Sequence, residues 1–177
     1  MDFKDANSGL LVPKHYIEIK GHYEATILRA GEVIDEFEFD NVVVNEGLNA
    51  TLNAMLAGGP QYTSWFLGLF TGNYTPIATD TAATIAGNST EATGYTAAAR
   101  QQWLPAAPSA QAVTNAASRA SFTFNATQSI YGAFLVSSAT INGTSGVLFG
   151  AAQFGTPKSV VNADQLLLTY TASVSST

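Results

Sequence analysis

The chain has 177 residues, the length of one domain, and only 11% of them are charged, against about 25% in an average globular protein. The formal net charge of −6 disfavours nonspecific binding to nucleic acid, and the lack of cysteine excludes disulfides, thiol catalysis and cysteine-ligated metals. Because 46% of the residues are hydrophobic, we expect a packed core beneath a surface of small polar residues, which buries against other protein at little desolvation cost.

The charge is concentrated at one end, because residues 1–58 carry the whole net charge of −6. Histidine occurs only as His15 and His22, so a site with three histidine ligands cannot form within one chain. No apolar run approaches the ~20 residues of a membrane-spanning helix, and we therefore expect no membrane partner. The first residues lack a basic stretch followed by an apolar one, so no secretory signal is expected either.

Two parts are predicted along the chain: an N-terminal arm over residues 1–14 and a single β-sandwich domain over residues 15–177. In the arm, Asp, Asn, Ser and Gly favour loops and Pro13 prevents regular strand pairing. Within the domain, a long irregular insertion is expected around residues 71–117, and loops of this length are usually functional or mobile. Residues 94–103 inside it are predicted as a strand.

A hairpin with an acidic face is predicted near the start of the domain. Strand patterns begin at His15 and continue to Arg29, and Ala30-Gly31-Glu32 is expected to form the turn. The return strand over residues 33–40 places Phe37 and Phe39 on one face, and its other face carries Glu36, Glu38 and Asp40.

One short helix is predicted over residues 45–57. Asn45 is a favourable N-cap, and Glu46 suits the positive end of a helix. An apolar stripe at helical spacing is expected to face the core, and Gly58-Gly59-Pro60 ends the helix. The stripe consists of Leu48, Leu52, Met55 and Leu56.

Further short strands complete a mainly β, antiparallel β-sandwich of jelly-roll-like type with one short α-helix. These strands are predicted over residues 65–70, 118–125, 130–137, 146–154 and 165–173. Asn142-Gly143 is a strong turn signal between two of them. The predicted core consists of Phe37, Phe39, Leu48, Leu52, Trp65, Leu67, Phe122, Phe124, Phe134 and Leu168.

Two groups of side chains could carry chemistry, but each has a simpler interpretation. His22 and Glu24 share a strand face that Glu36 or Glu38 could oppose, as in a divalent-metal site; an exposed polar edge is the favoured interpretation. The acidic stripe on residues 36–40 lacks the converging loop that calcium requires, so a solvated face or a patch for a basic partner is favoured.

A glycosidase pair formed by Asp80 and Glu91 has no supporting residues around it in the sequence. Asn-x-Thr patterns are common but fit chance in a chain rich in Asn and Thr. The aromatic residues lie in β-patterned segments, where core packing is favoured over a stacking platform for sugars or bases. We therefore predict no catalytic, cofactor-binding or metal site.

Six β-rich segments, taken together and in order, carry a resemblance. They are FDNVVVNEGLN (39–49), WFLGLFTGNYTP (65–76), EATGY (91–95), RQQW (100–103), ASFTFN (120–125) and IYGAFL (130–135). In this arrangement, which covers about residues 33–173, the chain resembles small structural proteins encoded in the virion-assembly regions of tailed bacteriophages. These are the capsid decoration (cement) proteins and related tail or fibre components. The resemblance implies a place in the virion and no catalytic site.

The expected function is therefore that of a non-enzymatic virion structural protein, a capsid decoration subunit that binds and stabilises the assembled phage head. Its expected partners are the major capsid protein lattice and other copies of itself in a homo-oligomer, with no cofactor. It would be made in the host bacterial cytoplasm and end on the capsid exterior. A phage tail or tail-fibre component that binds a host receptor or glycan is the alternative, and a secreted bacterial adhesin module is a further one.

The regions expected to contact other subunits are the arm, residues 1–14, and the insertion, residues 71–117. Segments of low charge lose little solvation when a partner buries them. The acidic face of residues 36–40 is expected to suit a basic patch on the shell.

Overall fold

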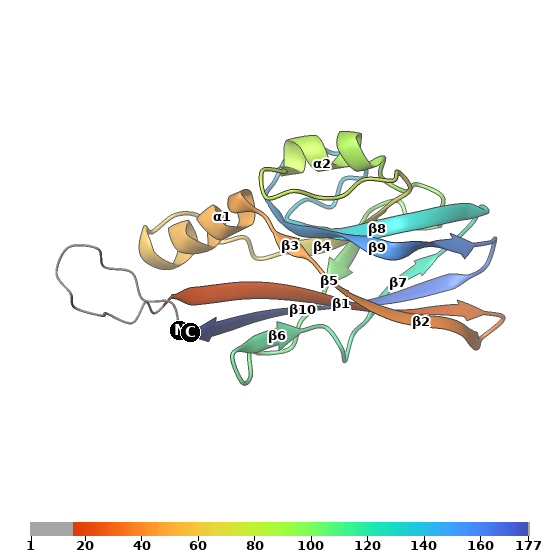
Figure 1. The fold of residues 1–177 in the computed structure, drawn as a ribbon, viewed down its shortest axis with the longest axis horizontal. Helices are drawn as coiled ribbons and strands as arrows, with labels where there is room; N and C mark the ends of the chain where they lie inside the picture. Colours follow the sequence, from red (N-terminus) through yellow and green to blue (C-terminus); the bar gives the residue numbers. More distant parts are fainter. Residues whose placement is uncertain (1–15, 177) are drawn as a thin grey trace, which may run out of the picture.

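A computed structural model describes residues 16–176, which form two antiparallel β-sheets that face one another (Figure 1). This confirms the predicted mainly β, antiparallel class. The predicted arm, residues 1–14, lies outside the described residues. No helix within residues 16–176 has both the length and the apolar character needed to cross a membrane.

The first sheet is built around a pair of long strands, β1 and β10. The strand order is β2-β1-β10, and two short strands, β6 and β7, pair with successive parts of the far edge of β10. The strands of this sheet are β1 (Ile17–Arg29), β2 (Glu32–Asp40), β6 (Ala112–Thr114), β7 (Ala120–Thr123) and β10 (Gln165–Ser176).

The predicted hairpin between β1 and β2 is confirmed, with a tight turn at Ala30 and Gly31. Both residues have positive φ, 50° and 86°. A two-residue turn with two positive φ angles matches the right-handed twist of the flanking strands, and glycine adopts such a φ without steric cost.

Asn115 fills the gap between β6 and β7 along β10. Its buried side chain donates to the Leu168 carbonyl at 3.2 Å and accepts from the Tyr170 amide at 2.7 Å. The amide group thus replaces the backbone partners that β10 lacks at this point. A buried backbone group without such a partner would carry a desolvation penalty.

The second sheet has the strand order β3-β9-β8-β4-β5. It confirms the strands predicted over residues 65–70, 130–137 and 146–154, whereas the strand predicted over residues 94–103 is limited to its last three residues. The strands are β3 (Val42–Val43), β4 (Trp65–Phe70), β5 (Gln101–Trp103), β8 (Gln128–Val136) and β9 (Leu148–Val160). Asn142 adopts a positive φ of 57° in the predicted turn before β9.

The main core lies between the two sheets. Leu67, Phe122, Phe124 and Leu168 are buried there, as predicted. Phe37, Phe39 and Trp65 are only partly buried and pack against the edge of this core, which corrects their predicted place in its interior. Tyr23 and Tyr170 are fully buried at its centre, with ring centroids 4.6 Å apart.

A second core lies on the outer face of the second sheet, beneath a helix that the sequence pattern did not predict. This helix, α2 (Ala82–Ser89), covers β8 and β9 and buries Ile85 completely (Figure 1). The prediction of one helix was therefore wrong. The segment is short and rich in small residues, so it lacks the long apolar stripe that would identify it.

Two glycine–phenylalanine pairs make room for this second core. Gly68 is paired with Phe134 across β4 and β8, and Phe70 is paired with Gly132. Each phenylalanine ring lies over the glycine opposite, where a Cβ atom would collide with it. Phe134 is buried as predicted, but in this outer core rather than between the sheets.

The predicted helix is present as α1 (Asn45–Leu56), with Val44 rather than Asn45 as its N-cap. Its apolar stripe is not in the core. Leu48 is half-buried, and the exposed fractions of Leu52, Met55 and Leu56 are 55%, 73% and 80%. The predicted core position of Leu52 was therefore wrong; the buried residue of α1 is Gly47, in its first turn, which packs on Phe149.

The glycine–phenylalanine pairing leads to a first prediction. Gly132→Ala should destabilise the fold by about 1–3 kcal/mol or more, since the added methyl collides with the Phe70 ring and with the Ala152 carbonyl. Gly155→Ala is the matched control, because no atom lies within 4 Å of its Cβ position, and it should change stability by less than about 0.5 kcal/mol. Urea denaturation measures both, and equal midpoints would contradict the packing described here.

Candidate functional site

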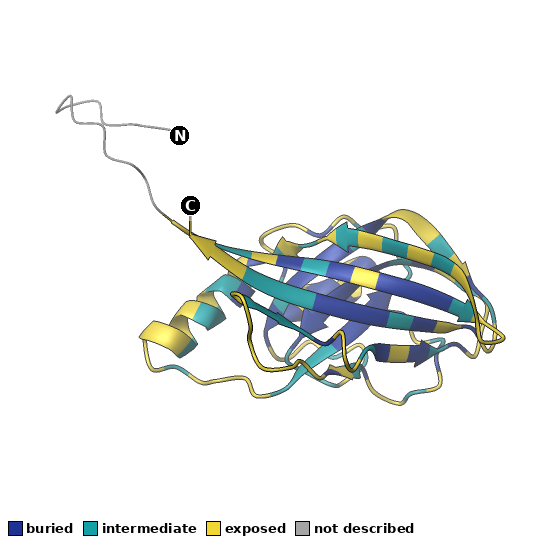
Figure 2. Cartoon of the chain, turned by 90° about the horizontal axis from the view of Figure 1, so that it is seen from below, coloured by how far each residue is buried: buried dark blue, intermediate teal, exposed yellow. Residues whose placement is uncertain are grey.

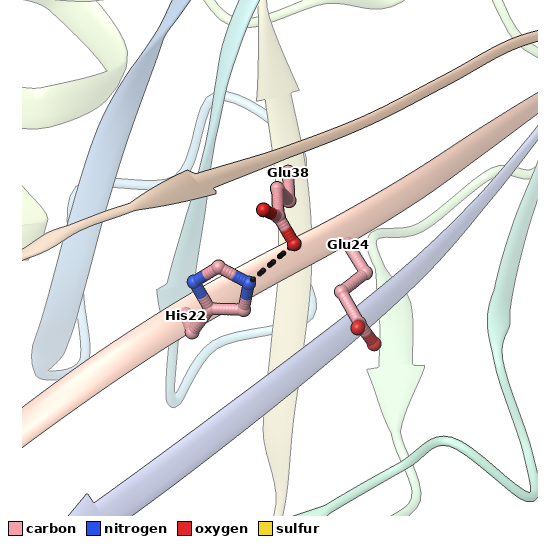
Figure 3. Close-up of side chains that lie close together, drawn as sticks. All are labelled: His22, Glu24 and Glu38. Carbon is pink, nitrogen blue, oxygen red and sulfur yellow. Dashed lines mark ion pairs between the residues drawn. The ribbon is translucent and has the colours of Figure 1, made fainter.

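The outer face of the first sheet brings together the residues considered for a metal site. Potential ligand atoms of His22, Glu24 and Glu38 lie within 4.8 Å of one another (Figure 3). The His22 Nε2 atom is 3.6 Å from a Glu38 carboxylate oxygen, and its Nδ1 atom is 2.8 Å from Asp40. Of the two predicted partners, Glu38 opposes Glu24 in the strand register, whereas Glu36 opposes Thr26.

One imidazole and two carboxylates could hold a divalent cation with water as a further ligand. The side chains of Glu38 and Asp40 are 76% and 89% exposed, so both carboxylates remain solvated as they stand. This arrangement is equally suited to an edge strand whose charges prevent pairing with another sheet. These observations therefore do not identify the cluster as a metal site.

A polar cleft of about 500 Å³ lies beside this cluster, between β1, β2 and the segment before β7. Arg119 enters it and donates to the Thr26 hydroxyl at 2.6 Å and to the Leu167 carbonyl at 3.2 Å. Together with Glu36 it gives the cleft mixed charge. The positive charge of Arg119 therefore partly balances the negative charge of the acidic stripe of β2 on the side of the cleft. Along the strand, the stripe is open to solvent.

Asp80 and Glu91, the candidate glycosidase pair, are both buried, and each is occupied by structural partners. Asp80 accepts from the Tyr74 hydroxyl at 2.7 Å and from the Ile77 amide at 2.9 Å. These bonds fold the loop that leads into α2. Each carboxylate is therefore committed to structural bonds of its own.

Glu91 instead forms a buried ion pair with Arg100. The two side chains are 0% and 1% exposed and make two parallel hydrogen bonds of 2.7 and 2.8 Å. Arg100 also donates to the Ser138 carbonyl, and its guanidinium lies 5.1 Å from the centre of the Phe134 ring. The Asn142 amide donates to Glu91 at 2.6 Å. One ion pair thus ties the segment after α2 to the turn between β8 and β9.

This pair supplies a second prediction. Arg100→Met should lower the free energy of unfolding by about 3–5 kcal/mol, because Glu91 would lose its buried ion-pair partner. Lys20→Met, which breaks the exposed Lys20–Glu18 pair of 3.1 Å, is the matched control and should cost under about 1 kcal/mol. Chemical denaturation measures both. Similar losses for the two variants would show that the buried pair is not a structural link.

Glu46 joins three elements through a single carboxylate oxygen. This Oε2 atom accepts from the Ala82 amide at 2.8 Å and from the Leu148 amide at 2.7 Å. Ala82 is the first residue of α2, where a negative charge is favoured by the helix dipole. The residue predicted to stabilise its own helix therefore stabilises the N-terminus of the other one and anchors α1 to β9.

A further buried carboxylate, Asp164, holds the far end of β1. It accepts two hydrogen bonds from Arg29, of 2.9 and 2.8 Å, and one from the Val161 amide of 2.9 Å. The hydrogen bonds from Arg29 hold the pKa of the Asp164 carboxyl below its ordinary value of 3.8, although burial acts in the opposite direction. The folded state therefore favours the ionised carboxylate of Asp164 over its protonated form.

A pH dependence follows from this lowered pKa. The stabilisation from Asp164 should be complete above the ordinary value of 3.8 and should disappear as the pH falls through the lower pKa of the folded state. Asp164→Asn should therefore cost about 1–3 kcal/mol at neutral pH and progressively less in acid. Denaturation of both proteins between pH 7 and pH 2 measures the difference. A constant difference, or one that grows in acid, would contradict this role; the exposed Glu24→Gln variant is the control.

The helix α1 lies at the end of the molecule where β1 begins and β10 ends (Figures 1 and 2), and several large exposed apolar side chains gather around it. Between α1 and these two strands lies a groove of about 840 Å³, which we call the α1 groove. Its apolar lining consists of Ile17, Ile19, Val43, Leu48, Leu52, Met55, Leu56 and Val174.

A smaller apolar pocket of about 390 Å³ lies on the other side of the helix, where Met55 faces Tyr62 and Trp65. The helix is therefore flanked by hydrophobic hollows on both sides. The sequence identified these helix residues but placed them in the core, because a stripe that packs on its own sheet and one that packs on a partner have the same spacing.

A further hollow, of about 670 Å³, lies beside β9 and is lined by both polar and apolar side chains. Gln153 bonds to the side chains of Asn73 and Thr75 there, at 2.5 and 2.6 Å. Tyr131 contributes an aromatic ring to the same hollow. Amide and hydroxyl groups beside an aromatic ring could bind a polar ligand such as a sugar.

No protein family model matches the chain, and no curated protein matches it.

Proposed function

We propose that this chain is a non-enzymatic structural subunit that acts by binding other protein, and specifically a decoration subunit on the exterior of an assembled phage head. The observation that carries the proposal is the exposed apolar surface around α1. The exposed fractions of Met55 and Leu56, 73% and 80%, are high for large apolar side chains. A contiguous apolar surface of this kind on a folded protein is characteristic of a site that binds other protein.

The use of charge in the structure supports the same proposal. The buried carboxylates of Asp80, Glu91 and Asp164 are engaged in bonds that hold loops and strands together. Such groups position the backbone and are not held ready for proton transfer. The exposed part of the chain carries few charged residues, and this lowers the desolvation cost of burying it in an assembly.

A decoration subunit stabilises a shell by mass action. If it binds the assembled lattice and not separated capsid subunits, binding shifts the equilibrium toward the shell by an amount set by its concentration and affinity. Packaged DNA pushes outward, so a clamp across subunit boundaries strengthens the particle without any chemical step. The acidic face of β2 would orient the subunit through a basic patch on the shell.

The alternative, a tail or tail-fibre component that binds a host receptor or glycan, is favoured by one observation. The polar hollow beside β9 offers Asn73, Thr75 and Gln153 with the ring of Tyr131. A glycan-binding protein would use this hollow, whereas a decoration subunit would use the α1 surface. Variants of the two surfaces therefore separate the two functions.

The decisive experiment compares phage particles with and without this protein. Particles that lack it should release DNA at lower temperature, and restoring the wild-type protein should raise that temperature again. Loss of adsorption to cells with unchanged heat resistance would instead support the fibre function. The number of copies in purified particles gives an independent check, because hundreds indicate the head and a handful indicate the tail.

A surface variant tests which face binds. Leu52→Asp combined with Met55→Asp should weaken binding to particles at least about 10-fold, since interface centres tolerate buried charge poorly. Val33→Asp is the matched control, because Val33 is also exposed, at 55%, but lies at the opposite end of β1. If the two variants bind alike, the α1 surface is not the contact.

A further inference from the structure

We propose that His22, Glu24 and Glu38, which we call the His22 cluster, bind a zinc ion, and that Asp40 positions the imidazole for it. The inference is independent of the proposed function, because it concerns the purified protein and is tested without a capsid. Glu38 also belongs to the acidic face of β2, so a bound ion would lower the negative charge of that face. It would leave the α1 surface, which carries the proposed function, untouched.

The strand register places these side chains on one outer face of the first sheet. His22 and Glu24 are two residues apart on β1, and Tyr23 between them is buried, so both point away from the core. On β2, Asp40 lies opposite His22. Glu38 lies opposite Glu24. Cross-strand neighbours have Cβ atoms about 4.5–5.5 Å apart, which brings the four side chains within reach of one another.

Protection of an edge strand accounts for only half of this arrangement. β2 is at the edge of the sheet, but β1 is hydrogen-bonded on both sides, to β2 and to β10. Charges that discourage pairing with another sheet are needed on the edge strand alone. His22 and Glu24 lie on β1 and therefore need a different explanation. Glu24 makes no hydrogen bond or ion pair with another residue of 16–176.

The hydrogen bond to Asp40 prepares the imidazole of His22 as a ligand. The Nδ1 atom lies 2.8 Å from an Asp40 carboxylate oxygen, which can only accept, so Nδ1 carries the proton. In the neutral imidazole, Nε2 then presents its lone pair. Metal-binding histidines usually donate their other ring N–H to a carboxylate or a carbonyl in this way. Asp40 is thus a positioning residue, and Nε2 is the donor atom.

The spacing of the donor atoms suits a single ion. The Nε2 atom of His22 points toward Glu38 and is 3.6 Å from its carboxylate oxygen (Figure 3). This distance is too long for a hydrogen bond. Two ligands at about 2.0–2.1 Å from a tetrahedral zinc ion lie about 3.3–3.4 Å apart, which is close to the observed spacing. Glu24 offers the third donor within 4.8 Å, and rotation of its exposed side chain closes the remaining distance.

The chemistry of the donor set favours zinc over calcium or magnesium. Calcium takes about six to eight oxygen ligands, and magnesium requires an octahedral shell of oxygens. An imidazole nitrogen instead suits zinc and the neighbouring transition metals. One imidazole and two carboxylates give zinc three protein ligands, and water completes the tetrahedron.

The charge of the neighbouring cleft also favours a cation. Its lining includes three carboxylates and one guanidinium, a net charge of −2, from Glu24, Glu36, Glu38 and Arg119. No ion pair joins Arg119 to a carboxylate within residues 16–176, and its side chain donates instead to uncharged oxygens. The negative charge of the cleft is therefore not neutralised by direct pairing. A divalent cation at the His22 cluster would balance it.

Isothermal titration of the full-length protein, free of any purification tag, with zinc chloride tests the proposal. We expect saturable binding of one zinc ion per chain that an excess of calcium or magnesium does not displace. Asp40→Ala should weaken binding about 10–100-fold, as the loss of a group that orients a ligand does. His22→Ala and Glu38→Gln should each weaken it at least about 10-fold, because each removes a ligand.

Two control variants separate a defined site from general attraction of cations to acidic groups. Glu36→Gln removes the same charge as Glu38→Gln but lies one position along the stripe, opposite Thr26, and should change the affinity much less. His15→Ala removes the other histidine of the chain and should bind zinc as the wild type does. Circular dichroism and urea denaturation without zinc should show the same fold in every variant.

Nitrogen NMR of the histidine side chains gives an independent readout of the role of Asp40. Zinc should shift the Nε2 resonance of His22 and leave Nδ1 protonated. A zinc ion on Nδ1 would contradict the positioning role. The proposal as a whole is overturned by a wild-type protein without saturable zinc binding, by unchanged binding after His22→Ala, or by equal losses from Glu36→Gln and Glu38→Gln.

Discussion

The structure depends on the burial of both faces of the second sheet. On one face, β4 and β8 pack against the first sheet, and on the other they must also be covered, since Phe70 and Phe134 project there over Gly132 and Gly68. The short helix α2, which lies in the chain between β4 and β5, provides this cover. Part of what the sequence suggests as an irregular insertion is thus the cover of the second core, whereas Ala92, Tyr95 and Trp103 in the same range belong to the main core.

A few carboxylates hold this arrangement in place. Glu46 links α1, α2 and β9, Glu91 links the segment after α2 to the β8–β9 turn, and Asp164 fastens the end of β1. Each of them accepts at least one backbone amide besides its other partners. In a chain with so few charges, internal loops are therefore fixed by anions that satisfy several donors at once, which leaves the surface neutral over much of its area.

The sequence predicts those parts of the fold whose pattern is local. Alternation of apolar residues identifies β1, β2 and β8, and Ala30-Gly31 marks the turn, because strand faces and positive φ angles leave direct traces in the residue order. It misses α2, whose short run of small residues is stabilised by contacts that the pattern does not show, the burial of Ile85 on the sheet and the hydrogen bond from the Ala82 amide to Glu46. It also places Leu52 in the core, since spacing shows that a stripe is apolar and not which surface covers it. For the candidate site, it brings His22, Glu24 and Glu38 to one face but gives no sign of the α1 groove, which is formed by strands from both ends of the chain.

Exposed apolar side chains on α1 are unfavourable for an isolated subunit. An assembled subunit could bury them against a partner. A soluble monomer could replace Leu52, Met55 and Leu56 by polar residues without disturbing its core, because all three side chains are exposed. Retention of all three imposes a risk of aggregation that only a partner removes. The low charge of the chain acts in the same direction, since it lowers both the solubility of the free protein and the desolvation cost of the bound one. The two features together support the proposal that this protein acts as part of a larger assembly.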